Sequence, residues 1–177
     1  MTAPTPAIPA LLDGVTAHQA DLNGWSSNLT NLYTYTQAGF RTLKPQTVLR
    51  RTTAQSIPNG TDTLISWSVA DISTDGMWAS GTTMTVKTAG VYRLRAQVAT
   101  LAAYSTNSLY IVVNGTSSSS NAVGVFSGTG NSCSCSATLS LAVGATIAAI
   151  YNQSTGSSQS TATTFGNPRL EALWVSP

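Results

Sequence analysis

The apolar residues of this chain change their spacing near residue 40. Between residues 15 and 32 they recur at alternating steps of three and four, as they do along one face of an α-helix. From about residue 48 onward they alternate with polar residues, which is typical of half-buried strands. The pattern therefore predicts a short N-terminal helix joined to a β-domain. The predicted helical seam consists of Val15, His18, Leu22, Trp25, Leu29 and Leu32.

The predicted helix begins with a capping box, in which Thr16 is the N-cap and Gln19 reaches back to its amide. It ends before Ala38 and Gly39, because glycine favours a helix C-terminus. Its interior is rich in Asn, Ser and Thr and includes Gly24, so the isolated helix is expected to be unstable. Either sister copies of the helix bury the seam as a trimeric stalk, which we favour, or the β-domain does.

Residues 1–12 contain three prolines, which predict an extended arm that is either disordered or, as we favour, laid on a partner. The first ten residues hold no basic residue, so we expect no secretory signal. No run of about 18 apolar residues predicts a membrane span. The expected organisation is an attachment arm at 1–12, helix and linker at 13–45, and a β-domain at 46–177.

Turn-forming residues divide the β-domain into short segments. Along one of them, Arg93 and Arg95 alternate with Tyr92 and Leu94. Asn114-Gly115 predicts a hairpin turn or longer loop, and residues 153–164 predict an exposed polar loop. The absence of helical segments between the strands predicts an all-β antiparallel jelly-roll sandwich. The predicted strands are 46–52, 62–69, 82–87, 90–100, 107–114, 121–126, 132–141, 145–153 and 168–176.

Charged residues make up only 8% of the chain, against about 25% in ordinary soluble domains. Hydroxyl and amide side chains must therefore provide solubility. A net charge of +2 is too small to indicate nucleic acid. Arg41, Lys44, Arg50 and Arg51 lie close together, and we expect a solvated collar or a contact to an acidic subunit. No aromatic residues interleave with them to stack on bases.

Catalysis has little support in the sequence. The chain has one His and one Glu, whereas acid–base catalysis needs a tuned His or paired carboxylates. No Gly-x-Ser-x-Gly elbow is present. Glu171 lies two positions after Arg169, which predicts a surface ion pair. We expect a non-enzymatic protein.

Candidate metal ligands are sparse, and we expect no cofactor and no metal. Cys133 and Cys135 share one face of a predicted strand, where they are expected to be small buried residues. Residues 71–76 imitate the start of a calcium loop, but Thr82 replaces the acid at position 12, so a plain turn is expected. In a trimer, three copies of His18 would meet near the axis; the alternative is an exposed histidine at the helix end.

Four aromatic residues are candidates for packing or recognition. Trp67 and Tyr92 are assigned to strands and are expected to fill the core or a three-fold seam. Trp78 and Tyr104 fall near loops, where they could contact a glycan or a host surface. Packing is the favoured role for these two as well.

The stretch from Gln55 to Val98 resembles the trimeric jelly roll of tumour necrosis factor-like ligands and complement-type globular heads. Those domains carry a Gly-x-Tyr-x-Phe-like core strand after a polar turn. Gly90, Tyr92 and Leu94 match this strand, with Leu94 at the aromatic position. The segment 168–175 also fits the closing strand of that architecture.

More specifically, residues 15–176 resemble small virion proteins of tailed phages that infect actinobacteria. The shared features are an Asp-Leu-Asn-rich helix, the segment 54–63, the turn Asp75-Gly76-Met77 and the strand that begins at Gly90. The resemblance implies a homotrimer on the exterior surface of the virion. Such a protein would be a capsid decoration, head fibre or minor tail protein, attached to capsid or tail proteins through residues 1–12 and the helix.

Two other functions stay open at this point. One is a tip module that binds a host receptor or a cell-surface glycan. The other is a secreted cytokine-like or complement-like ligand. The lack of a recognisable signal, of a collagen-like tract and of charge argues against the secreted ligand.

Overall fold

The computed structural model describes residues 44–101, 105–117, 121–163 and 166–177. Residues 44–177 form one compact unit. All regular secondary structure in the described ranges is β, and none of their residues belongs to a helix that could cross a membrane. The arm at 1–12 and the predicted helix lie outside the described residues.

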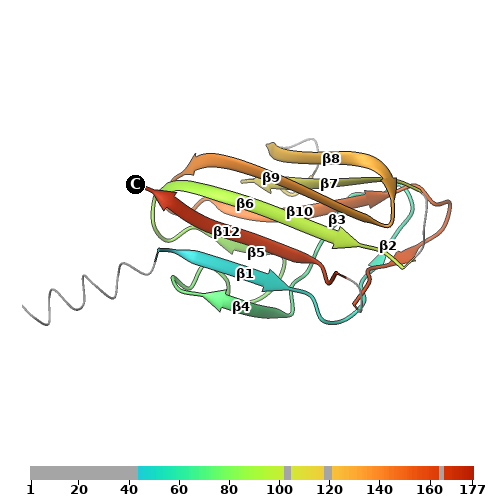
Figure 1. The fold of residues 1–177 in the computed structure, drawn as a ribbon, viewed down its shortest axis with the longest axis horizontal. Helices are drawn as coiled ribbons and strands as arrows, with labels where there is room; N and C mark the ends of the chain where they lie inside the picture. The colour runs from blue at the N-terminus through green and yellow to red at the C-terminus, as the bar shows by residue number, and fades with distance from the viewer. Residues whose placement is uncertain (1–43, 102–104, 118–120, 164–165) are drawn as a thin grey trace, which may run out of the picture. The chain divides into compact units, whose positions relative to one another are not determined.

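The described residues form twelve strands in two main sheets and one small sheet (Figure 1). All the strand pairs are antiparallel. In order across the first sheet lie β4 (Val69–Ser73), β1 (Gln46–Arg50), β12 (Arg169–Ser176), β6 (Gly90–Ala99) and β9 (Ser132–Leu141). The second sheet contains β3 (Thr63–Leu64), β10 (Thr146–Gln153), β7 (Ser105–Val113) and β8 (Ala122–Gly130), and β5 (Thr83–Thr85) also pairs with β10. The small sheet pairs β2 (Ser56–Ile57) with β11 (Gln159–Ser160).

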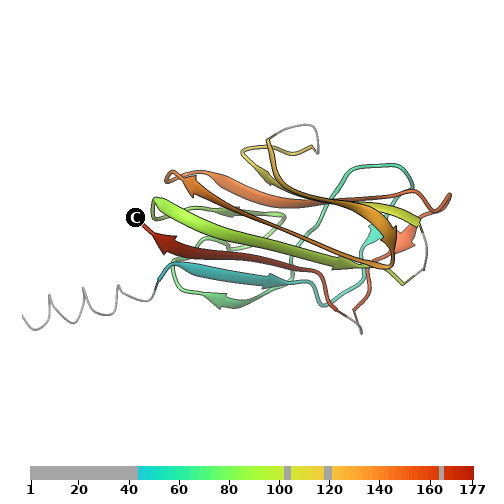
Figure 2. The same ribbon diagram turned by 45° about the horizontal axis from the view of Figure 1, so that its top comes forward.

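The two main sheets face each other as the layers of a sandwich (Figure 2). Neighbours in each sheet come from distant parts of the chain: β12 lies between β1 and β6, and β10 pairs with β3, β5 and β7. The antiparallel all-β sandwich predicted from the alternating pattern is confirmed.

The core forms where the alternating apolar side chains of the two sheets meet. Tyr92 and Leu94 on β6 are fully buried, and Ile147 and Tyr151 on β10 join the same cluster. The Tyr92 hydroxyl donates a hydrogen bond of 2.7 Å to the carbonyl of Thr88. Burial of one such side chain contributes roughly 1.5–3 kcal/mol. The core positions predicted on β6 are therefore confirmed.

One predicted strand, 62–69, is wrong. Its residues divide into β3 and the start of β4, which belong to different sheets. Trp67 lies between them rather than in a strand, yet it is buried, and its indole Nε1 donates to the Thr82 carbonyl at 3.2 Å. The chain changes layers here, so a continuous alternation does not correspond to one continuous strand.

The loop predicted as exposed between 153 and 164 is partly buried. Gln153 is 1% exposed, and its Nε2 donates to the carbonyls of Ile57 at 3.0 Å and Ser157 at 2.8 Å. Thr161 and Ala162 are also buried. The pairing of β2 with β11, which the sequence pattern does not predict, holds this loop against the end of the sandwich.

Candidate interface on the outer face of the five-stranded sheet

The register of the first sheet aligns its outward side chains in rows. Alternate residues of β6 and β12, such as Leu94 and Ala172, are buried in the core, so the residues between them point away from it. We call these outward positions the outer face. Its rows are Gln46, Leu173, Arg93 and Thr138; then Val48, Glu171, Arg95 and Ser136; then Arg50, Arg169, Gln97 and Ser134.

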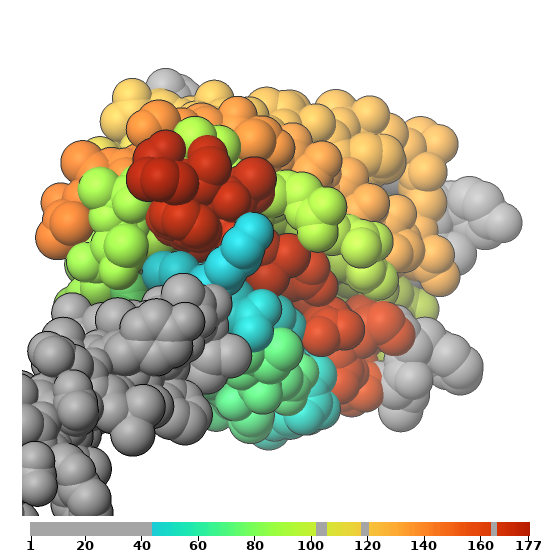
Figure 3. Space-filling view, turned by 60° about the vertical axis from the view of Figure 1, so that its left-hand side comes forward, coloured from blue at the N-terminus to red at the C-terminus, as the bar shows by residue number. Residues whose placement is uncertain are grey.

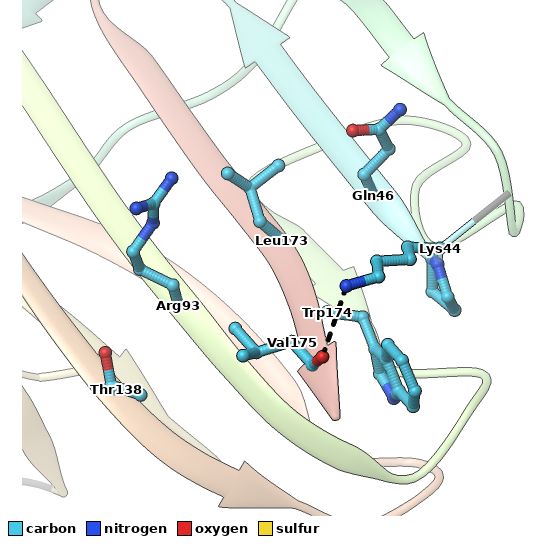
Figure 4. A pocket seen from close by; sticks show the side chains of 8 residues that line it. Lys44, Gln46, Arg93, Thr138, Leu173, Trp174 and Val175 are labelled. Atoms are coloured by element: carbon cyan, nitrogen blue, oxygen red, sulfur yellow. Dashed lines mark hydrogen bonds between the residues drawn. The ribbon is translucent and has the colours of Figure 1, made fainter. Parts of the chain in front are cut away.

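The first row borders a groove with a volume of about 510 Å³ (Figure 4). Leu173 and Val175 lie between a wall that carries Lys44 and a wall that carries Arg93. The Lys44 ammonium donates to the Val175 carbonyl at 3.5 Å. Figure 3 shows the end of β12, in red, directly against the cyan start of β1. The lining residues are Lys44, Pro45, Gln46, Arg93, Thr138, Leu173, Trp174 and Val175.

One side of the outer face carries a chain of ion pairs. Arg50 Nε lies 3.1 Å from both oxygens of Asp71, and Nη2 lies 2.9 Å from Oδ1. Arg169 lies 3.9 Å from Asp71 and 3.8 Å from Glu171, so the pair predicted between Arg169 and Glu171 is confirmed. The hydrogen bond from Arg50 lowers the pKa of the Asp71 carboxyl below its usual value.

The other side carries arginines without acidic partners. Arg93 and Arg95 are exposed on β6, and no side-chain carboxylate within the described ranges lies within 4 Å of either guanidinium. Beside them, the outward positions of β9 carry hydroxyls only. These are Ser132, Ser134, Ser136, Thr138 and Ser140. Positive charge and short hydroxyl side chains thus share one edge of the sheet.

The prediction that Arg51 belongs to a solvated collar of basic residues is wrong. Its guanidinium donates to the Ser66 carbonyl at 2.6 Å and to the Ala54 carbonyl at 3.2 Å, so it links the end of β1 to the next segments. Burial lowers the pKa of Arg51 from its usual value. Arg50 is engaged by Asp71, and Arg41 lies outside the described residues.

The remaining predicted site residues fall in three places. Gly90, Tyr92 and Leu94 lie on β6 and are buried. Trp78 is half-buried against the core, and its Nε1 donates to the Gly81 carbonyl at 3.3 Å, which favours packing over ligand contact. Outside the described residues lie Tyr104 and the helical seam of Val15, His18, Leu22, Trp25, Leu29 and Leu32.

The two cysteines are small buried residues, as predicted. Cys133 and Cys135 are 3% and 8% exposed, and both thiols are free. Burial raises the pKa of each thiol to about 12. Both are therefore protonated at neutral pH and are poor nucleophiles and metal ligands.

Residues 71–76, whose spacing imitates a calcium loop, do not form one, because the first of them lies in a strand. Asp71 lies on β4 and is paired with Arg50, whereas Asp75 accepts a hydrogen bond of 2.7 Å from the Thr88 hydroxyl. The two carboxylates therefore serve separate contacts. Within the described ranges, no three His, Cys, Asp or Glu side chains cluster as metal ligands would.

The outward side of the second sheet has an apolar centre. Val112, Ala148 and Ile150 form a small buried cluster there, with Leu64 and Tyr110 packed against it. The charged outer face on one sheet and this apolar cluster on the other give the sandwich two chemically different sides.

Solved structures with the same arrangement establish the fold. Murine APRIL, of the tumour necrosis factor family, at pH 5.0 has 17% identity and a TM-score of 0.55 over 75% of this chain and 99% of that chain. The pH 8.0 structure has 18% identity and a TM-score of 0.54, over 73% and 98%. The globular domain of zebrafish complement 1qA has 13% identity and a TM-score of 0.50, over 76% and 100%.

The chain therefore has the jelly-roll fold of tumour necrosis factor-family ligands and complement C1q globular heads. No protein-family model matches the chain, and no curated protein has a significant sequence match to it. The resemblance to phage virion proteins stays a prediction.

Proposed function

We propose that this chain is a non-enzymatic structural protein that assembles as a homotrimer on the exterior of a tailed-phage particle. It would serve as a capsid decoration, head fibre or minor tail protein. The jelly-roll fold supports an assembling module, and the sequence resemblance of residues 15–176 supports the virion role. The outer face of the first sheet is the structural observation on which the proposed self-association rests.

The outer face has the properties of a surface that copies of the chain share. The β9 hydroxyls are short, so they lose little side-chain entropy on burial and can form hydrogen bonds to a neighbour. Leu173 and Val175 add apolar surface, and Val175 is 47% exposed. The groove beside them leaves space for side chains of a second copy.

The helical seam is proposed to hold the three chains together. Leu29→Asp should convert trimer to monomer, because three carboxylates would replace apolar contacts on one axis. Thr30→Asp, one position off the seam, adds the same charge and should leave the trimer intact. Sedimentation velocity reports the mass, and an unchanged trimer with unchanged helicity in Leu29→Asp would refute the stalk.

Attachment is proposed to depend on residues 1–12. Deletion of this arm should leave the trimer mass unchanged and abolish incorporation into particles. Particles purified with tagged full-length or truncated chain would be compared by immunoblot. Equal incorporation of the two chains would contradict attachment through the arm.

The structural neighbours favour one second candidate, a free ligand of the cytokine or complement type. A free ligand would bind a cell surface at saturable sites and would not need residues 1–12. A related candidate, a host-binding tip, would need the loops around Trp78, Tyr104 and 153–164 for attachment but not for assembly. Binding of labelled full-length and truncated chain to host cells, beside the particle assay, separates these functions.

A further inference from the structure

The chain contains two Asn-Gly pairs, Asn59-Gly60 and Asn114-Gly115. This dipeptide can modify itself: the backbone nitrogen of the glycine attacks the side-chain amide of the asparagine, and ammonia leaves. Glycine favours the reaction because it has no Cβ to hinder the approach and lets the backbone rotate. The dipeptide is the same at both places, so any difference in reactivity must come from the structure around each pair.

Both asparagine side chains accept a hydrogen bond from a backbone N–H. The Thr146 N–H donates to Asn114 Oδ1 at 2.8 Å. The Gly156 N–H donates to Asn59 Oδ1 at 2.7 Å. Negative charge develops on this oxygen when a nucleophile adds to Cγ, and a donor already in place stabilises that charge. The two sites therefore assist the side-chain carbonyl in the same way.

The attacking nitrogen differs between the two pairs. The Gly60 N–H donates to the carbonyl of Gln153 at 2.7 Å, and Asn59 forms a β-bridge with the same residue. Attack by Gly60 must break this hydrogen bond first. Gly115 lies between β7 and β8, outside any strand, and its N–H makes no backbone hydrogen bond within the described ranges. The nucleophile is therefore restrained in the first pair and not in the second.

The contacts of Asn114 permit the rotation that attack requires. Its own N–H donates to the Thr146 carbonyl at 2.9 Å, so its backbone nitrogen and its side chain are both held at the start of β10. Rotation about its Cα–C bond can bring the Gly115 nitrogen toward Cγ without breaking either bond. Asn114 is exposed and lines a second groove of about 350 Å³, so water reaches it.

We propose that Asn114 is a site of spontaneous deamidation in the folded protein and that Asn59 is protected. The Gly115 nitrogen forms a bond to Asn114 Cγ, the Cγ–Nδ2 bond breaks, and the proton of the attacking nitrogen leaves with Nδ2 as ammonia. Water then opens the succinimide ring. Cleavage between the ring nitrogen and Cγ gives aspartate, and cleavage between that nitrogen and the backbone carbonyl carbon gives isoaspartate.

Either product places a new carboxylate directly after β7. The formal net charge of the chain falls from +2 to +1, which is a large change where only 8% of the residues are charged. Isoaspartate also adds a methylene to the backbone of the turn between β7 and β8. The site belongs to a single chain, so the inference does not depend on the proposed homotrimer.

The test incubates the full chain at mildly alkaline pH, both folded and in concentrated urea. Trypsin places Asn59 on the peptide 52–87 and Asn114 on the peptide 96–169, and fragment mass spectra locate the deamidated residue. In the folded chain, Asn114 should react about tenfold or more faster than Asn59, because the Gly60 hydrogen bond and its bridge raise the barrier. In urea the two rates should become similar.

Two variants identify the nucleophile. Gly115→Ala should slow the reaction at Asn114 severalfold in both the folded and the unfolded chain, because a Cβ hinders the attacking nitrogen. Thr116→Ala changes the next residue and should keep the wild-type rate. The variant Asn114→Asp supplies the charge standard for ion-exchange chromatography of the products.

Three results would overturn the inference. Equal rates at Asn59 and Asn114 in the folded chain would show that the Gly60 hydrogen bond gives no protection. A folded chain that stays intact at Asn114 while the chain in urea reacts would show that the fold blocks this site. A rate in Gly115→Ala equal to that of the wild type would exclude attack by the Gly115 nitrogen.

Discussion

Gly90 begins β6 directly beneath the side chain of Trp174 on the neighbouring strand. Its φ is +150°, and a Cβ at this position would lie 2.5 Å from the Ser176 carbonyl oxygen and closer still to the indole. The Trp174 Nε1 donates to the Ala89 carbonyl at 3.1 Å, which holds the ring over the glycine. The glycine therefore serves close packing between β6 and β12.

Gly90→Ala should lower the free energy of unfolding by about 3 kcal/mol or more, because the backbone or the indole must move. Gly81→Ala is the matched control: Gly81 has φ +86°, but nothing lies within 4 Å of its Cβ position. Gly81→Ala should lower the free energy of unfolding by only about 1–2 kcal/mol. Urea unfolding measures both, and equal losses would show that the indole does not restrict position 90.

The burial of the two thiols predicts how the folded protein reacts with a thiol reagent. Native protein at pH 7.5 should not react with a thiol-specific aromatic disulfide over minutes, because the thiols of Cys133 and Cys135 are buried and protonated. Both should react at once in denaturant. Rapid labelling of the folded protein would contradict the inward direction of these side chains.

Among the elements, long strands could be predicted and short ones could not. β9 matches its predicted range, and β6 ends one residue earlier than predicted, because ten residues of regular alternation define a strand locally. β2, β3 and β11 have two residues each. They pair because other strands are brought beside them, and no local pattern encodes such a contact.

The candidate interface was predictable only in part for a similar reason. Alternation along β6 places Arg93 and Arg95 opposite to the core residues. The neighbours of Arg93, which are Leu173 and Thr138, come from distant segments, and only the pairing of β12 and β9 with β6 brings them beside it. The helical seam has a clear local pattern and lies outside the described residues.

The ion pair between β4 and β1 predicts a response to acid. The pKa of Asp71 is lowered in the folded state, so the pair contributes stability above the usual carboxyl pKa of about 3.9. That contribution is lost as pH falls through the folded-state value. Asp71→Asn should have a lower urea midpoint than wild type at pH 6, and the difference should shrink toward pH 2. A constant difference would contradict this role of the charge.

For the whole molecule, the buried thiols and Tyr151 predict sensitivity to alkali. Burial raises the pKa of all three groups to about 12, from usual values of 9.0 for Cys and 10.0 for Tyr. The unfolded chain therefore loses these protons first. Their contribution to stability is fully present below pH 9 and is lost as pH rises toward 12.

Unfolding free energies between pH 8 and 11 would measure this loss, at a slope of up to about 1.4 kcal/mol per pH unit for each group. Cys135→Ala should have a shallower slope above pH 9 than wild type, although packing lost at this site lowers its stability at neutral pH. Identical slopes in the two proteins would exclude a contribution of the Cys135 thiol.

The ends of the described unit lie at one pole of the sandwich. Lys44 donates to the carbonyl of Val175, and both the start of β1 and the chain terminus lie at the left in Figure 1. The loop after Gln153 lies at the opposite pole (Figure 1). A peptide fused after Pro177 would therefore sit beside the start of the sandwich, whereas one grafted between Thr155 and Ser158 would be displayed at its far tip.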